Sequence, residues 1–119
     1  MKVTNGEVRL MRDALQKLIA LKMPVSLSLK LAKLANKVNV DFQDMELVRI
    51  SLVNQYGIKD ENGNMSVDLA PVEERNKFWS EFVSLLNQEV EIDAEPIVLS
   101  IPLDVEPSVL MPLLKFLKE

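Results

Sequence analysis

The sequence predicts a mainly helical α+β fold, with a long antiparallel helical hairpin, two further helices and a minor sheet of two or three strands. Three observations lead to this fold class. The chain from Ser26 to Tyr56 contains neither Gly nor Pro, which favours one long helix. Apolar residues recur every three or four positions between residues 8 and 21, and short stretches near residues 65 and 90 alternate between apolar and polar. These two periods are typical of an amphipathic helix and of half-buried strands.

The first helix is predicted to begin at a capping box. Thr4 is followed three residues later by Glu7, a spacing at which each side chain satisfies the other residue's backbone N–H. Pro24 is expected to end this helix, because the residue before a proline is disfavoured in the helical region.

Ser26 is predicted to cap the second helix, and the short connection makes the two helices antiparallel neighbours. Two apolar sets occupy the second helix. One recurs every seven residues, at Leu31, Val38, Met45 and Leu52. The other points elsewhere, so we expect this helix to be contacted on more than one side; it comprises Leu29, Ala32, Val40, Leu47, Ile50 and Val53. An alternative places a break within residues 38–41, with Asp41 capping a separate helix, because that stretch has poor helix propensity.

The remaining elements follow from local signals. Gly57 is expected to take a left-handed conformation after the long helix, and residues 60–64 have turn chemistry before a strand at residues 65–69. A third helix from Pro71 to about Gln88 is predicted to bury five apolar residues: Phe78, Trp79, Phe82, Val83 and Leu86. Strands are predicted at residues 89–93 and 97–101, and a last short helix from about Ser108 ends the chain.

Composition limits both organisation and chemistry. The 119 residues, of which 48% are hydrophobic and 27% charged, are the length of one domain, predicted as 1–119. The chain contains no Cys and no His, which excludes thiolate nucleophiles, disulfides and imidazole acid–base catalysis. We therefore expect no enzymatic activity, no catalytic residues and no cofactor. With no signal segment and no apolar stretch of about 20 residues, a cytoplasmic protein without membrane contact is expected.

Charge is unevenly distributed along the chain. Residues 1–57 carry nine Lys and Arg against five Asp and Glu, a net charge of +4, and residues 58–119 carry five against thirteen, a net charge of −8. The simpler interpretation is that the basic and acidic parts pack near each other and are solvated. The alternative is that one of them binds a partner of opposite charge.

Two stretches resemble metal sites, and neither is favoured as one. Residues 60–71 resemble a calcium loop, but Met65 replaces the required Gly and Pro71 the required Glu. Four acidic residues alternate from Glu89 to Glu95, which is the pattern of a solvated strand face. No metal site is predicted.

The basic side of the second helix is a candidate anion contact. Lys30, Lys33 and Lys37 share it, so contact with phosphate is a hypothesis. The lysines have no interleaved aromatic residues and no Arg cluster, and the sequence pI is about 4.9. A solvated helix face is therefore favoured over nucleic-acid binding.

The second apolar set supplies the candidate protein contacts. Leu47, Ile50 and Val53 are predicted to bind another protein or a second copy of the chain, because one neighbouring helix covers only about 100° of arc. Asp41 and Arg49 are candidates for setting the register of a homodimer across a two-fold axis.

Four stretches in order carry a resemblance to a known family: MKVTNGE, KMPVSLSLKLAKLANKV, NQYGIKDENGN and FVSLLNQEVEIDAEPI. Together they resemble an uncharacterised family of small proteins encoded by tailed bacteriophages and prophages of Gram-positive bacteria. The resemblance covers nearly the whole chain and implies a phage-encoded accessory protein. Family members have a charged, glutamate-rich middle to the long helix, where this chain has the more apolar VNVDFQDMELVRISL. This departure indicates additional burial by a partner or a second copy.

The leading expectation is a non-enzymatic phage accessory protein in the cytoplasm of an infected bacterial host. It would act through protein–protein contacts of the helical hairpin, in assembly, replication or modulation of a host factor. Two alternatives stay open. One is an acidic inhibitor of a host nucleic-acid-binding or defence protein, and the other is a nucleic-acid-associated module that uses the basic hairpin.

Overall fold

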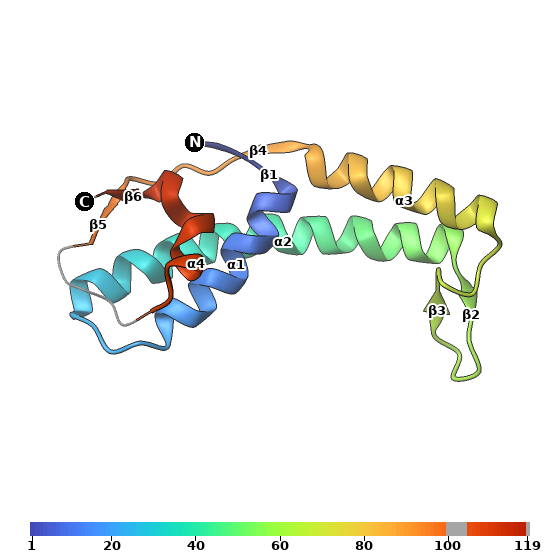
Figure 1. Cartoon of the computed structure of the whole chain (residues 1–119), viewed down its shortest axis with the longest axis horizontal. Coiled ribbons are helices and arrows are strands. Elements are labelled where there is room, and N and C mark those ends of the chain that lie inside the picture. The colour runs from blue at the N-terminus through green and yellow to red at the C-terminus, as the bar shows by residue number, and fades with distance from the viewer. Residues whose placement is uncertain (100–104, 119) are drawn as a thin grey trace. The chain divides into compact units, whose positions relative to one another are not determined.

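The computed structural model describes residues 1–99 and 105–118 (Figure 1). Their helices are α1 (Asn5–Ile19), α2 (Val25–Tyr56), α3 (Val72–Asn87), α4 (Pro107–Leu110) and the 3₁₀ helix η1 (Met111–Phe116). Their strands are β1 (Lys2–Thr4), β2 (Ile58–Lys59), β3 (Met65–Ser66), β4 (Glu89–Glu91), β5 (Ile97–Val98) and β6 (Leu117–Lys118). The predicted mainly helical α+β class is confirmed.

The chain divides into two compact units. The terminal unit comprises Met1–Phe42 and Glu89–Glu119, and the middle unit comprises Gln43–Gln88. The assignment of the chain to one domain stays a prediction.

Helix α1 begins as the sequence predicts. The Glu7 N–H donates to Thr4 Oγ1 at 3.1 Å, and the Thr4 N–H donates to Glu7 Oε1 at 3.2 Å, which is the reciprocal pair of a capping box. The predicted end at Pro24 is wrong, because α1 ends at Ile19. Leu18 is its last buried residue, and Leu21 and Met23 still pack against the core but lie outside the helix.

Helix α2 runs without a break from Val25 to Tyr56, which confirms the long helix and excludes the alternative break at residues 38–41. Its start differs from the prediction. The Pro24 carbonyl accepts hydrogen bonds from the N–H groups of Leu27 at 3.1 Å and Ser28 at 3.0 Å. Ser26 therefore lies inside the first turn, and its predicted role as the N-cap is wrong.

The core of the terminal unit joins α1 to the first part of α2, and in Figure 1 α1 crosses this part of α2 at an angle. This pair is the predicted helical hairpin. Apolar side chains from the second half of the chain complete the same core. Its buried members include Val8, Met11, Leu15 and Leu18 of α1, Leu27, Leu31, Leu34 and Val38 of α2, and Ile92, Ile97, Leu113 and Phe116.

In residues 1–99 and 105–118, three two-stranded sheets replace the expected sheet of two or three strands. β1 pairs antiparallel with β4, β2 antiparallel with β3, and β5 parallel with β6. β1, β2 and β6 were not predicted, because strands of two or three residues are too short to show an alternation. The part of the predicted strand 97–101 beyond Leu99 lies outside the described residues.

The predicted C-terminal helix is partly wrong. Helix α4 is a single turn, and the chain continues as a 3₁₀ helix and then β6. Pro112, at the start of η1, has no N–H to donate into an α-helical turn.

The middle unit contains the end of α2, the β2–β3 hairpin and α3. The predicted turn is present. Gly63 has φ of 82°, and the Asp60 carboxylate accepts from the N–H groups of Asn62 at 2.8 Å and Asn64 at 3.0 Å. The strand predicted at residues 65–69 covers Met65–Ser66.

The predicted buried face of α3 is partly wrong. Phe78 and Phe82 are buried as expected, but Trp79 is 52% exposed and Val83 is 51% exposed. Phe78, Phe82 and Leu85 are spaced by four and three residues and share the buried face. Trp79 and Val83 each follow a buried Phe by one position, which turns them about 100° around the helix toward solvent.

Gly57 does not take the left-handed conformation that was predicted for it. Its N–H donates to the Val53 carbonyl at 2.8 Å. A Cβ atom at Gly57 would lie 2.6 Å from that carbonyl oxygen and 3.0 Å from the Ser66 carbonyl. Glycine is required here by the close approach of two backbone segments.

Candidate functional site

Helix α3 presents an exposed apolar face. We call Val72, Trp79 and Val83 the Trp79 face; all three are exposed. Their spacings of seven and four residues place them on one side of the helix. Single exposed apolar residues are ordinary, but several on one helix face mark a candidate interaction surface.

Trp79 is held in place by two buried rings. Its ring packs edge-on against Phe78, with centroids 5.3 Å apart, and against Phe82, with centroids 5.8 Å apart. Phe78 and Phe82 stack on each other at 5.7 Å. Edge-to-face contacts at these distances are favourable, so the indole is fixed while half of its surface faces solvent.

The predicted partner-binding residues of α2 do not all behave alike. Leu47 is 69% exposed and Ile50 47% exposed, whereas Val53 is half-buried. Arg49 already has a partner in its own helix. Its guanidinium donates to the Glu46 carboxylate at 2.9 Å, and this hydrogen bond raises the pKa of Arg49.

Asp41 is half-buried and already interacts within the chain. It belongs to the terminal unit, whereas Leu47, Arg49, Ile50 and Val53 belong to the middle unit. Their roles in partner binding and in setting the register of a dimer stay predictions.

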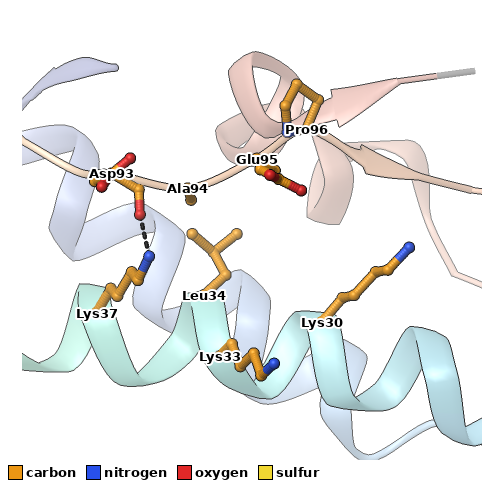
Figure 2. Close-up of a pocket in the computed structure, with 8 residues that line it drawn as sticks. All are labelled: Lys30, Lys33, Leu34, Lys37, Asp93, Ala94, Glu95 and Pro96. Carbon is orange, nitrogen blue, oxygen red and sulfur yellow. Dashed lines mark hydrogen bonds between the residues drawn. The ribbon is translucent and has the colours of Figure 1, made fainter.

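A groove in the terminal unit brings the three predicted anion-contact residues together (Figure 2). We call it the lysine groove. It has a volume of about 460 Å³, and it is lined by Lys30, Lys33, Leu34 and Lys37 of α2 and by Asp93, Ala94, Glu95 and Pro96 across from them. The Lys37 ammonium donates to the Asp93 carbonyl. Within residues 1–99 and 105–118, no ion pair forms to Lys30 or Lys33.

The acidic residues from Glu89 to Glu95 lie in different surroundings. Glu91 pairs with the Met1 ammonium at 2.8 Å, and Asp93 and Glu95 line the lysine groove. Over the described part of the chain, no three Asp or Glu side chains are arranged to hold a metal ion.

Sequence reasoning missed a second, more apolar groove. It has a volume of about 390 Å³ and lies between α1 and η1, with Leu10, Met111 and Leu114 in its wall. At its edge Glu7 pairs with Lys115 at 3.1 Å. The Thr4 N–H, and then Lys115, hold the pKa of Glu7 below its usual value. No sequence signal could have found this groove, because the two segments are about a hundred residues apart.

The net charge differs between the terminal unit and the middle unit. Residues 1–42 carry eight basic and three acidic residues, and residues 89–119 carry two and seven. These segments, of net charge +5 and −5, share the terminal unit and compensate each other. The middle unit has four basic and eight acidic residues, so its charge of −4 equals that of the whole chain.

Comparison with protein families, curated proteins and solved structures gives no match. No helix in the described ranges has both the length and the apolar character needed to span a bilayer.

Proposed function

We propose that this chain is a non-enzymatic protein-binding module whose partner docks on the Trp79 face of the middle unit. The supporting observation is the half-exposed Trp79, fixed against Phe78 and Phe82. Tryptophan is enriched among the residues that dominate binding energy in protein interfaces. A side chain that is already held loses little rotamer freedom on binding.

The chemistry of the partner follows from the charge of the middle unit. Five of its acidic residues, Asp44, Glu61, Asp68, Glu73 and Glu81, are exposed, and the unit has a net charge of −4. A partner with an apolar pocket for the indole and a basic rim would be complementary to this surface. Leu47 and Ile50 of α2 are retained as further candidate contacts in the same unit.

The resemblance to phage proteins extends the proposal to an accessory protein that binds a phage or host component. The same acidic surface favours a second candidate function, inhibition of a host protein that normally binds nucleic acid. In that case the acidic residues around the Trp79 face would occupy a basic groove in place of phosphate groups.

Affinity capture with matched variants tests the proposal. The full chain and its Trp79→Ala variant are used on lysates of phage-infected and uninfected bacteria, and captured proteins are identified by mass spectrometry. The control is Leu114→Ala, which removes an exposed apolar side chain from the terminal unit. We expect a protein that is captured by the wild type and the control and is lost with Trp79→Ala.

Trp79 is the only tryptophan in the chain, so its fluorescence reports directly on binding of the purified partner. We expect the emission to shift to shorter wavelength as the indole leaves water. An emission spectrum that is unchanged at saturating partner would contradict docking at the Trp79 face. The same shift with increasing concentration of the chain itself, together with a dimer mass by light scattering, would identify the partner as a second copy.

A further inference from the structure

We infer that the lysine groove binds the phosphate group of a small ligand. This site lies in the terminal unit and does not depend on the function proposed for the middle unit. It is formed by α2 and the segment Asp93–Pro96, which face each other in Figure 2. Its volume of about 460 Å³ is within the range of small-molecule sites, about 300–1,000 Å³.

The three lysines lie near one another on α2, and their exposed, flexible side chains can turn toward one anionic group. Lys30, Lys33 and Lys37 are spaced by three and four residues, so neighbouring Cβ atoms are about 5–6 Å apart. Their ammonium groups repel one another, and in the described residues no carboxylate pairs with Lys30 or Lys33. An anion in the groove would relieve that repulsion.

Lys37 is already oriented for this task. Its ammonium donates to the Asp93 carbonyl, which holds the long side chain across the groove (Figure 2). An ammonium has three donors, so two remain for a ligand. Part of the entropy cost of ordering the binding side chains is therefore met by the fold itself.

The donor set favours phosphate over carboxylate. Lysine binds phosphate as a point charge, and a phosphate monoester carries about −1.5 to −2 charges at neutral pH where a carboxylate carries one. The groove is lined by three lysines and no arginine. Two separate ammonium groups can approach different oxygens of a tetrahedral dianion.

The rest of the groove indicates a small ligand. Leu34, Ala94 and Pro96 give it an apolar part, which suits a ring or short carbon chain attached to the phosphate. Asp93 and Glu95 line the same groove, and Glu89 and Glu91 precede them in the chain. A nucleic-acid backbone following this segment would meet these carboxylates, so an extended polyanion fits less well than one phosphate group.

Three probes test the class of ligand by NMR titration of the full chain. Phenyl phosphate carries a phosphate on a ring, benzoate carries a carboxylate on the same ring, and an oligothymidylate carries phosphodiesters. We expect phenyl phosphate to shift the signals of the groove residues with a Kd of about 1–10 mM, as befits a ligand of so few atoms. We expect benzoate and the oligonucleotide to bind these residues at least about tenfold more weakly.

Variants with the same change of charge distinguish binding in the lysine groove from a general effect of the net charge of the chain. Lys30→Gln and Lys33→Gln should each weaken phenyl phosphate binding by about tenfold, the typical effect of losing one charged hydrogen bond. Lys22→Gln makes the same change of charge outside the groove and should leave the Kd unchanged. Glu95→Gln removes a like charge beside the ligand and should tighten binding.

Three results would overturn the inference. The first is that phenyl phosphate shifts no groove signals, and the second is that Lys22→Gln weakens binding as much as Lys33→Gln. The third is tighter binding of the oligonucleotide than of phenyl phosphate in a manner that depends on Lys30 and Lys33, which would assign the groove to nucleic acid. None of these measurements depends on Trp79.

Discussion

At the scale of single residues, one position around a helix decides whether an aromatic side chain is core or surface. Phe78 and Trp79 are neighbours in the chain, yet Phe78 is buried and Trp79 is half exposed. Hydrophobicity predicts that both prefer burial, but α3 has a limited buried arc. The nature of the Trp79 face could not be derived from residue type.

A substitution at Gly57 distinguishes two reasons for a glycine at this position, a left-handed backbone conformation and a lack of space for a Cβ atom. Asparagine tolerates the left-handed conformation but has a Cβ atom. Because that atom would lie 2.6 Å from the Val53 carbonyl oxygen, we expect Gly57→Asn to lower the free energy of unfolding by about 1–3 kcal/mol. Gly63→Asn is the control, since Gly63 has positive φ and open space around it, and it should cost under about 0.5 kcal/mol. Urea denaturation measures both, and a neutral Gly57→Asn would refute the steric explanation.

Glu7 gives a prediction for pH. The Thr4 N–H and Lys115 lower its pKa in the folded state, so the unfolded chain binds a proton first as pH falls. The stabilisation is complete above the unfolded pKa of about 4.3 and is lost as pH falls through the lower folded value. Glu7→Gln keeps a capping-box residue but cannot ionise. Thermal melts between neutral and acid pH should show a smaller loss of stability for the variant, and equal losses would contradict this role.

At the scale of elements, the terminal unit is completed by segments that look minor in the sequence. η1 has six residues, yet its Leu113 and Phe116 are fully buried in the same core as α1 and α2. A short 3₁₀ helix has little stability of its own. The η1 helix is therefore stabilised by the packing of Leu113 and Phe116 in the core.

Substitution of two aromatic residues tests which of them belongs to a closed core and which to the surface. Phe116→Ala should lower the free energy of unfolding by about 3–5 kcal/mol, because it leaves a cavity in a closed core. Trp79→Ala should cost under about 2 kcal/mol, because it loses edge contacts with Phe78 and Phe82 but creates no closed cavity. Chemical denaturation followed by circular dichroism measures both. The reverse order of the two values would mean that the core has been assigned to the wrong residues.

At the scale of the whole molecule, formal charge follows the two units. The opposite charges of residues 1–42 and 89–119 cancel within the terminal unit, which differs from the division into residues 1–57 and 58–119 that the sequence suggested. The middle unit keeps the excess of acidic residues, and a unit with excess like charge is weakened by self-repulsion.

Salt should therefore stabilise the middle unit. We expect the urea midpoint that is followed by Trp79 fluorescence to rise when NaCl increases to about 0.5 M, with a gain of up to about 1 kcal/mol. Glu81→Gln, which removes one exposed charge from this unit, should reduce the gain. A midpoint that falls with salt would show that attractive ion pairs such as Glu46–Arg49 outweigh the repulsion.

The sequence by itself determined the helical class, the capping box at Thr4 and Glu7, the unbroken course of α2 to Tyr56 and the turn at Gly63. Each depends on contacts within a few residues, or on a period that one helix repeats many times. The tertiary structure alone decided the pairing of β1 with β4 and of β5 with β6, the exposure of Trp79 and the closing of the lysine groove by Asp93–Pro96. These features depend on segments far apart in the chain, and their positions are set by packing, which no local pattern of residues encodes.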